Sequence, residues 1–273
     1  MNKVYEYVTD EICRQLEQGT IPWRKPWQGG EAINYVTRKP YRGINRLLLP
    51  GGEFLTFKQV QALKGHIKKG AKSYMVTFWK KFDNSKENDD GKIEINNKPG
   101  FMLRYYRVFS LNDVEGIDTK LTVQEFEFTP IQECENIVVN YKDCPVVKHE
   151  EPQAYYSPSM DHINMPDKKL FENEQEYYST LFHEMIHSTG HASRLNRHSE
   201  QKNAAFGSKD YSKEELVAEI GAAMLCGVSR IENSTLENSA AYIQAWLTKL
   251  RDDKSLIMTA AGKAQKASDY IQQ

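Results

Sequence analysis

The chain has 273 residues, of which 40% are hydrophobic, and its net charge is −1. This length allows two modest domains, and the hydrophobic fraction is typical of globular proteins. No hydrophobic run approaches the roughly 20 residues of a membrane helix, so we expect no membrane association. Four cysteines without a CxxC pair, and a start without the hydrophobic stretch of a signal peptide, predict reduced thiols and a cytoplasmic location.

Charge is distributed unevenly along the chain. Residues 1–82 hold 15 Lys and Arg against 6 Asp and Glu, a net charge of +9. Residues 83–150 carry −6 and residues 151–273 carry −4. A basic first third joined to an acidic remainder predicts an anion-binding module ahead of a module of another kind.

Hydrophobic periodicity predicts an α+β protein with helices and strands in both halves. In the first half we expect helices over 5–18 and 56–63, and antiparallel strands over 74–82 and 104–109. In the second half we expect short strands within 153–165 and helices that begin near 173, 211, 239 and 257.

An irregular, acidic stretch separates the two halves. It indicates a basic first domain over residues 1–125, a linker over 126–150 and a second domain over 151–273.

The most informative motif is the pentapeptide at 183–187, which reads HExxH. On a helix, residues four apart lie on one face, so His183 and His187 can bind one metal ion while Glu184 lies beside them. Such a Glu can take a proton from the water that attacks a peptide carbonyl. The motif therefore predicts a zinc-dependent peptidase, provided that a third ligand exists.

Two signals place this motif on a helix. Asn173 followed three residues later by Glu176 has the pattern of a capping box at a helix start. Gly190 offers a helix stop just beyond the second histidine.

Glu215 and Glu219 are the two candidates for the third ligand. They lie four apart on the helix predicted from about 211, a spacing that resembles the ExxxE helix of gluzincin peptidases. In that pattern the first acid binds zinc and the second orients a zinc-bound histidine. Ser212 and Glu215 can instead form a capping box, which leaves Glu219 as the ligand. The gluzincin pattern favours Glu215.

A histidine after the motif offers a competing third ligand. The metzincin pattern HExxHxxGxxH requires a histidine at the position of Ser193. His191 comes two residues too early for this pattern, so we expect it to be a polar residue beyond the helix.

The basic first third also carries aromatic residues next to cations, as a single-strand DNA binder requires. The alternative is that the tryptophans belong to the core and the cations to a solvated face. The residues predicted to contact DNA are Trp23, Arg24, Lys25, Trp27, Arg38, Tyr41, Arg42, Arg46, Lys68, Lys69 and Lys72.

Motifs along nearly the whole chain resemble those of the ArdC antirestriction proteins. The N-terminal domain of that family is similar at Pro22-Trp23, Pro26-Trp27, Tyr41-Arg42-Gly43-Ile44-Asn45, Leu55-Thr56-Phe57-Lys58-Gln59 and Tyr106-Arg107-Val108-Phe109. Its metallopeptidase domain is similar at HExxH, Arg194-Leu195-Asn196-Arg197, the stretch 214–220 and the tail 260–267. Related N-terminal regions occur in plasmid TraC-type primases.

The resemblance implies a single-stranded-DNA-binding domain followed by a zincin-like domain, in a bacterial protein encoded on a conjugative plasmid or other mobile element. Such proteins protect incoming DNA from host restriction. We therefore expect Zn2+ on His183, His187 and Glu215, with Glu184 as general base and Glu219 as the orienting acid. The partners would be single-stranded DNA and an unidentified protein or peptide substrate. The alternative is a DNA-coating protein without proteolytic activity, in which the zinc domain is structural.

Overall fold

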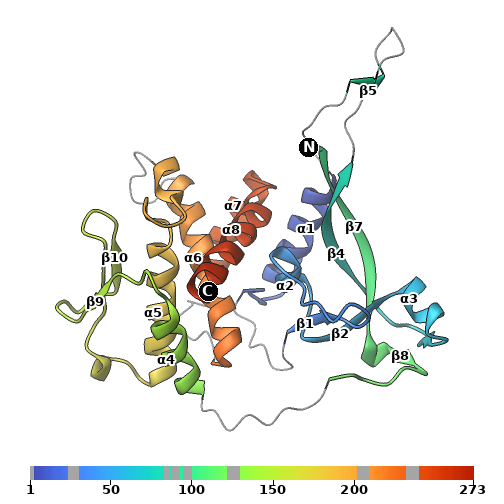
Figure 1. The fold of residues 1–273 in the computed structure, drawn as a ribbon, viewed down its shortest axis with the longest axis horizontal. Helices are drawn as coiled ribbons and strands as arrows, with labels where there is room; N and C mark the ends of the chain where they lie inside the picture. Colours follow the sequence, from blue (N-terminus) through green and yellow to red (C-terminus); the bar gives the residue numbers. More distant parts are fainter. Residues whose placement is uncertain are drawn as a thin grey trace.

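The computed structural model describes residues 3–23, 31–82, 86–87, 93–94, 100–121, 130–201, 209–231 and 240–273. It combines helices and sheets in two lobes, as the sequence predicts (Figure 1). None of the described helices is both long enough and hydrophobic enough to cross a bilayer. All four cysteines are described and free.

The helices and strands occupy the following residues. The helices are α1 (Lys3–Glu17), α2 (Ile44–Leu48), α3 (Phe57–Ala62), α4 (Pro130–Asn140), α5 (Glu174–Ser188), α6 (Lys209–Ser229), α7 (Ala240–Asp252) and α8 (Leu256–Ile271). The strands are β1 (Ala32–Asn34), β2 (Gly52–Thr56), β3 (His66–Ile67), β4 (Ser73–Phe82), β5 (Lys86–Glu87), β6 (Ile93–Glu94), β7 (Gly100–Ser110), β8 (Val114–Glu115), β9 (Val146–Lys148), β10 (Tyr155–Ser157) and β11 (His162–Asn164).

The first lobe is built on a four-stranded sheet in the order β1-β2-β7-β4. β4 and β7 pair antiparallel from Ser73 opposite Phe109 to Phe82 opposite Gly100, which confirms the predicted strand pair. One face of the sheet buries Phe54, Val76 and Val108 in a small core. Side chains on the two faces of this long strand pair alternate, because successive residues of a strand point in opposite directions.

The second lobe packs α4, α5 and α6 together beside a three-stranded sheet in the order β10-β11-β9. The predicted strands before the HExxH helix are β10 and β11, which pair antiparallel. The segment predicted as a linker, 126–150, instead contains α4 and β9. Cys134, Ile137 and Tyr141 are buried against the helices, so the described part of this segment belongs to the second lobe.

The two lobes share their largest core. Val8, Ile12 and Leu16 of α1 belong to the same buried cluster as Phe182 of α5 and Leu225 of α6. α1 contacts β7 on one side and α7 and α8 on the other, and it lies between the sheet and the C-terminal helices in Figure 1. The hydrophobic face of the first helix therefore joins the lobes.

Candidate metal centre

α5 and α6 bring three potential metal ligands together. His183 and His187 lie one turn apart on α5, and Glu215 faces them from α6. The two histidine Nε2 atoms are 3.1 Å apart. The Glu215 carboxylate lies 3.6 Å from Nε2 of His183 and 3.5 Å from Nε2 of His187. This trio is the metal-ligand cluster found among the described residues.

The distances fit a divalent cation. Tetrahedral zinc with bonds of about 2.0–2.2 Å places its ligand atoms about 3.3–3.5 Å apart. The separations between the three side chains bracket this value. Two imidazoles and one carboxylate leave one tetrahedral position for water or substrate, as in catalytic rather than structural zinc sites.

Asn173 starts α5 in the predicted way. Its side chain accepts a hydrogen bond from the Glu176 backbone N–H at 2.9 Å. The Glu176 carboxylate accepts from the Glu172 N–H at 2.9 Å, so half of the capping box forms. α5 ends at Ser188. The HExxH motif therefore lies within α5, which holds both histidines on one face of the helix.

Glu184 lies between the two histidines in sequence and is buried, with 8% exposure. Its charge helps to raise the pKa of His187. A carboxylate held beside the cation site is suitably placed to accept a proton there.

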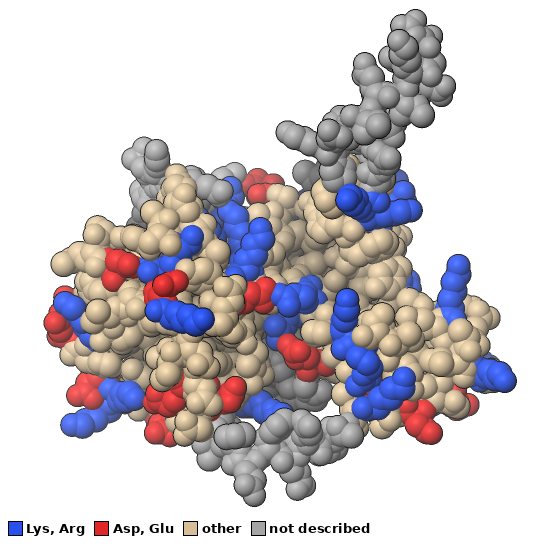
Figure 2. Space-filling view, viewed as in Figure 1, with Lys and Arg blue, Asp and Glu red and all other residues tan. Residues whose placement is uncertain are grey.

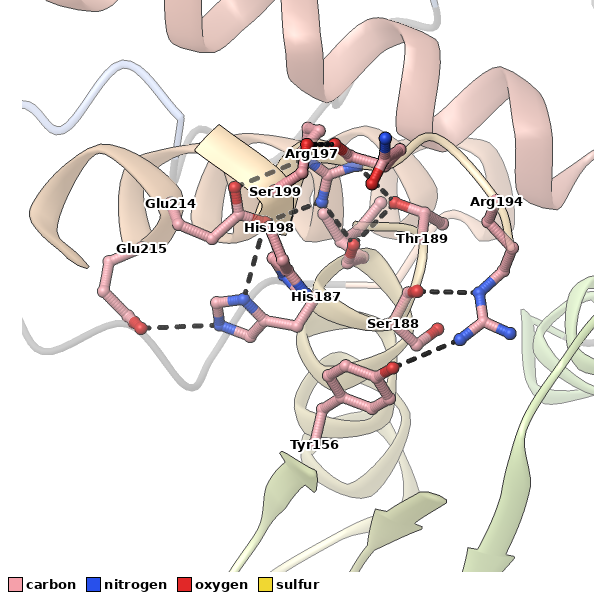
Figure 3. A network of polar contacts seen from close by, with 12 residues as sticks. Tyr156, His187, Ser188, Thr189, Arg194, Arg197, His198, Ser199, Glu214 and Glu215 are labelled. Atoms are coloured by element: carbon pink, nitrogen blue, oxygen red, sulfur yellow. Dashed lines mark hydrogen bonds and ion pairs between the residues drawn. The ribbon is translucent and has the colours of Figure 1, made fainter. Parts of the chain in front are cut away.

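Glu214 holds the other side of the His187 ring, a role that the sequence analysis missed (Figure 3). Its carboxylate lies 3.8 Å from Nδ1 of His187, while Glu215 approaches Nε2. Arg197 donates to Glu214 at 2.6 Å and His198 approaches it at 3.7 Å. Burial raises the pKa of Glu214, but contacts with the two histidines and Arg197 outweigh burial and lower it well below its usual range.

Arg197 also ties this carboxylate to the end of α5. It donates to the backbone carbonyl of Ile186 at 2.8 Å and to Oγ1 of Thr189 at 2.7 Å. The Arg197 and Glu214 side chains are both nearly inaccessible to solvent. The pair therefore connects α6 to the turn that carries His187.

The electrostatic surroundings of His187 favour a cation. Burial lowers its pKa, but the contact with Glu214 and the charges of Glu184 and Glu215 outweigh burial and raise the pKa to about 9. Carboxylates that stabilise an imidazolium also attract a metal ion.

Glu219, the predicted orienting acid and alternative ligand, lies one turn further along α6, and its carboxylate bonds to Trp23 and Tyr242 instead of a histidine. Its Oε2 accepts hydrogen bonds from Nε1–H of Trp23 at 3.0 Å and from the Tyr242 hydroxyl at 2.5 Å. Burial raises the pKa of Glu219 to about 7, against the opposing effect of these donors. The capping alternative for Glu215 does not fit the helix start, because α6 begins at Lys209, before Ser212.

Close helix contact at one glycine allows the ligands to meet. A Cβ added to Gly221 of α6 would lie 2.7 Å from Cδ1 of Ile186 on α5. Such a distance is too short for a real contact. The close approach of α5 and α6 therefore requires a residue without a side chain at position 221. Gly190 has a similar role, because its added Cβ would lie 2.4 Å from Nε2 of His198.

The loop after α5 is fixed to the small sheet. Arg194 donates to the Ser188 carbonyl at 2.7 Å and to the Tyr156 hydroxyl at 3.2 Å. It also pairs with Asp161, which accepts a hydrogen bond from Tyr156 at 2.7 Å. β10 thereby stays beside the metal helix, and it forms one edge of its sheet.

Three residues predicted to contact DNA are packed in the interior, which corrects the prediction for them. Trp23 is fully buried against Trp246. Tyr41 packs edge-on against Phe54. Arg46 is 7% exposed and pairs with Glu31 at 3.0 Å. Basic and aromatic residues that are adjacent in sequence do not show which way their side chains point. The sequence pattern therefore could not distinguish buried aromatic residues from exposed ones.

The remaining predicted DNA contacts differ in their surroundings. Arg38 pairs with Glu53 and Arg42 pairs with Asp269. Lys68, Lys69 and Lys72 are exposed, and Nζ of Lys68 donates to the Asn112 carbonyl at 2.9 Å. Arg24, Lys25 and Trp27 lie outside the described residues.

Two families match separate parts of the chain. Residues 2–109 match the N-terminal domain of anti-restriction factor ArdC, and residues 133–263 match a zincin-like metallopeptidase. The second match begins inside the segment predicted as a linker, in agreement with the place of α4. A zincin-like domain implies a divalent metal.

Solved structures and curated relatives extend the likeness to the whole chain. Crystal structures of the antirestriction ArdC protein from plasmid R388, metal-free and Mn(II)-bound, are 34% and 35% identical, each with a TM-score of 0.76. Each alignment covers 98% of this chain and 96% of that one. Protein y4eC of Sinorhizobium fredii is 34% identical over 98% of this chain and 91% of its own.

DNA primase TraC of Escherichia coli is 31% identical over 98% of this chain. The aligned region is only 20% of that primase. Because two whole-length relatives exceed 30% identity and both halves match, the chain belongs to the ArdC family of antirestriction proteins.

Proposed function

We propose that this protein binds single-stranded DNA, carries a zinc-dependent peptidase centre and protects incoming plasmid or mobile-element DNA from host restriction. Membership of the ArdC family supports the antirestriction role. The observation that carries the peptidase role is the convergence of His183, His187 and Glu215 with Glu184 on the same helix.

His183, His187 and Glu215 would hold the metal ion. When bound there, zinc supplies Lewis acidity that lowers the pKa of a water molecule and polarises a carbonyl. Imidazole and carboxylate ligands also accept Mn2+, the ion in one R388 ArdC structure.

Glu184 acts as the general base. It takes a proton from the water that attacks the scissile carbonyl and delivers that proton to the departing amine. Glu214, held by Arg197, keeps the His187 ring in the orientation that points Nε2 at the ligand cluster.

The free edge of β10 offers a place for an extended peptide. β10 contacts α5 and pairs only with β11 among the described strands. A substrate that adds a strand here would gain backbone hydrogen bonds and would lie beside α5.

Exposed cations favour a polyanion on the first lobe. Lys68, Lys69 and Lys72 are exposed there. In Figure 2 the lobe that holds the four-stranded sheet shows mainly Lys and Arg, whereas both signs are mixed on the lobe with the ligand cluster. This distribution suits phosphate contacts, which give sequence-independent binding.

The variant Glu184→Gln tests the peptidase role. It should keep one bound metal ion per chain and lose cleavage of a protein or peptide-library substrate by at least about 100-fold, since the base is gone. Glu174→Gln, an exposed acid on the same helix, should behave like the wild type. Unchanged cleavage by Glu184→Gln would refute the assignment.

The same variant separates the two explanations of protection. In plasmid transfer into a restricting host, loss of protection by Glu184→Gln supports a proteolytic mechanism. Full protection by this variant would instead support strand coating with a structural metal domain.

A further inference from the structure

Five of the six exposed aromatic side chains in the described part of the chain lie on or beside one strand pair, the exception being Phe57 of α3. Phe78, Trp79, Phe101 and Tyr105 on the β4–β7 strand pair are each at least 40% exposed, and Tyr7 on the neighbouring α1 is 48% exposed. Trp79 and Phe101, at 58% and 60%, are the most exposed of these aromatics. Solvent-exposed rings of this size that serve no core suggest a ligand with flat apolar faces.

Strand register sorts these rings onto two faces. Trp79 is opposite Leu103, Lys81 is opposite Phe101, and Thr77 is opposite Tyr105. Opposed residues share a face, so Trp79, Phe101 and Tyr105 lie on the same side of the strand pair. We call these three residues, with Tyr7, the aromatic row.

The row borders α1. The ring of Tyr7 meets that of Tyr105 edge-on, with centroids 5.9 Å apart. Leu103, which lies between Phe101 and Tyr105 on the same face of β7, is 3% exposed and belongs to the core that α1 shares. The rings therefore lie beside the packed helix α1.

Cations bracket the row on the same face. Lys81 is opposite Phe101, and Arg107 lies two residues beyond Tyr105 on β7. Both are exposed, and neither forms an ion pair with any residue in the part of the chain that the structure describes. Positive charge beside bare rings favours an anionic ligand over an apolar one.

We infer that the aromatic row is the surface on which single-stranded DNA binds, with bases stacked on Trp79, Phe101 and Tyr105 and phosphates near Lys81 and Arg107. The inference rests on the proposed DNA-binding function and gives it a location. It replaces the buried Trp23 and Tyr41 with exposed rings as stacking partners.

The spacing of the row suits an unpaired strand. Residues on one face of a strand repeat about every 6.8 Å, so Phe101 and Tyr105 stand about 14 Å apart, with Trp79 between them on the neighbouring strand. This interval accommodates several nucleotides of an extended single strand. A duplex hides its base faces and gains nothing from such rings.

Alanine variants of the row test the inference on the full chain. With a fluorescently labelled dT20 oligonucleotide, Trp79→Ala and Phe101→Ala should each weaken binding about 5- to 100-fold, since each removes a stacking platform. Trp79→Phe should keep most of the affinity. Oligonucleotide-induced quenching of tryptophan fluorescence should be smaller in Trp79→Phe than in the wild type.

Salt dependence tests the cations separately. Each of Lys81→Ala and Arg107→Ala should reduce the slope of log affinity against log salt by about 0.7, the value for one phosphate contact on a single strand. The matched controls are Lys80→Ala and Arg104→Ala, which remove exposed cations from the opposite face of the same strand pair. These controls should keep the wild-type slope.

The outcomes distinguish the inference from the function on which it rests. A wild-type protein that does not bind dT20 refutes DNA binding itself. A wild-type protein that binds, together with row variants that bind equally well or controls that lose as much, overturns the location alone. Row variants that only abolish self-association in light scattering also overturn it, because the rings would then join two copies.

Discussion

At the scale of single residues, the proposed metal centre depends on side chains that are not proposed ligands. Glu214 contacts His187, His198 and Arg197 at once, and all four groups come from short segments around the α5–α6 contact. Such outer partners fix the orientation of a ligand and are worth about 10- to 100-fold in metal affinity. Glu214 is therefore as informative a target as the ligands.

We predict that Glu214→Gln lowers the free energy of unfolding by about 3–5 kcal/mol, because it leaves the buried Arg197 charge unpaired. Metal affinity of the folded variant should also fall about 10- to 100-fold. Urea unfolding in EDTA measures the first effect and isothermal titration with zinc the second. Glu150→Gln, which breaks the exposed pair with Lys148, is the control and should cost less than about 1 kcal/mol. Equal effects of the two variants would contradict the account.

Glu219 predicts a pH dependence of stability. Its pKa in the folded protein is about 7, whereas an ordinary glutamate in an unfolded chain has a pKa of about 4.3. Between these values the unfolded chain releases the proton and the folded chain keeps it. The contribution of this residue to stability therefore falls as pH rises from about 4.3 to 7 and is constant above that.

Glu219→Gln removes this titration and keeps an oxygen that accepts from Trp23 and Tyr242. In EDTA, the variant should gain stability relative to the wild type between pH 5 and pH 8, measured by urea unfolding. A difference that is constant with pH, or that changes in the opposite direction, would refute the raised pKa.

Sequence reasoning identified part of this site and missed another part. The spacing of the HExxH motif and of the two acids on the next helix is visible in the sequence. His183, His187 and Glu215 could therefore be proposed together. Glu214 carried a weaker signal, because the residue before a ligand on a helix usually points elsewhere. Only the fold brings Arg197 to it across 17 positions of sequence.

At the scale of elements, the crossing of α5 and α6 sets the geometry of the centre. The two helices touch where Gly221 faces Ile186, the residue next to His187. A tighter or looser crossing changes the distance from Glu215 to both histidines. The glycine is thus a packing requirement of the site and not a helix breaker.

We predict that Gly221→Ala destabilises the protein by about 1–3 kcal/mol through overpacking and weakens zinc binding, although alanine favours helix formation. Combining it with Ile186→Ala should cost less than the sum of the two single changes. Gly262→Ala on α8 is the control, since its added Cβ meets no atom within 4 Å, and it should stabilise by about 0.5–1 kcal/mol. Thermal and urea unfolding measure all four variants, and strict additivity would contradict the contact.

Helices with a strong hydrophobic periodicity could be predicted from the sequence. A helix in a stretch that was interpreted from its composition alone could not. α1, α5, α7 and α8 follow clear helical patterns and appear close to their expected bounds. The stretch 130–140 looked irregular because of its acidic residues. Yet Cys134 and Ile137 lie three apart and are buried, a helical signal that the composition obscured.

At the scale of the whole molecule, the two lobes are less separate than the charge pattern suggests. The apolar face of α1 and the indole of Trp23 come from the basic third, but they pack among the helices of the metal domain. A local hydrophobic pattern shows that such a face is buried. It does not show which part of the protein packs against that face. The shared core was therefore beyond the reach of the sequence.

The central claim is that His183, His187 and Glu215 hold one divalent ion, with Glu219 outside the set. Zinc titration of full-length Glu215→Gln and Glu219→Gln, monitored by calorimetry beside the wild type, tests it most directly. We predict one ion per chain in the wild type, a loss of more than about 100-fold in affinity in Glu215→Gln, and near-wild-type affinity in Glu219→Gln. A Glu215→Gln protein that still binds zinc as tightly as the wild type, while Glu219→Gln does not, would contradict the account.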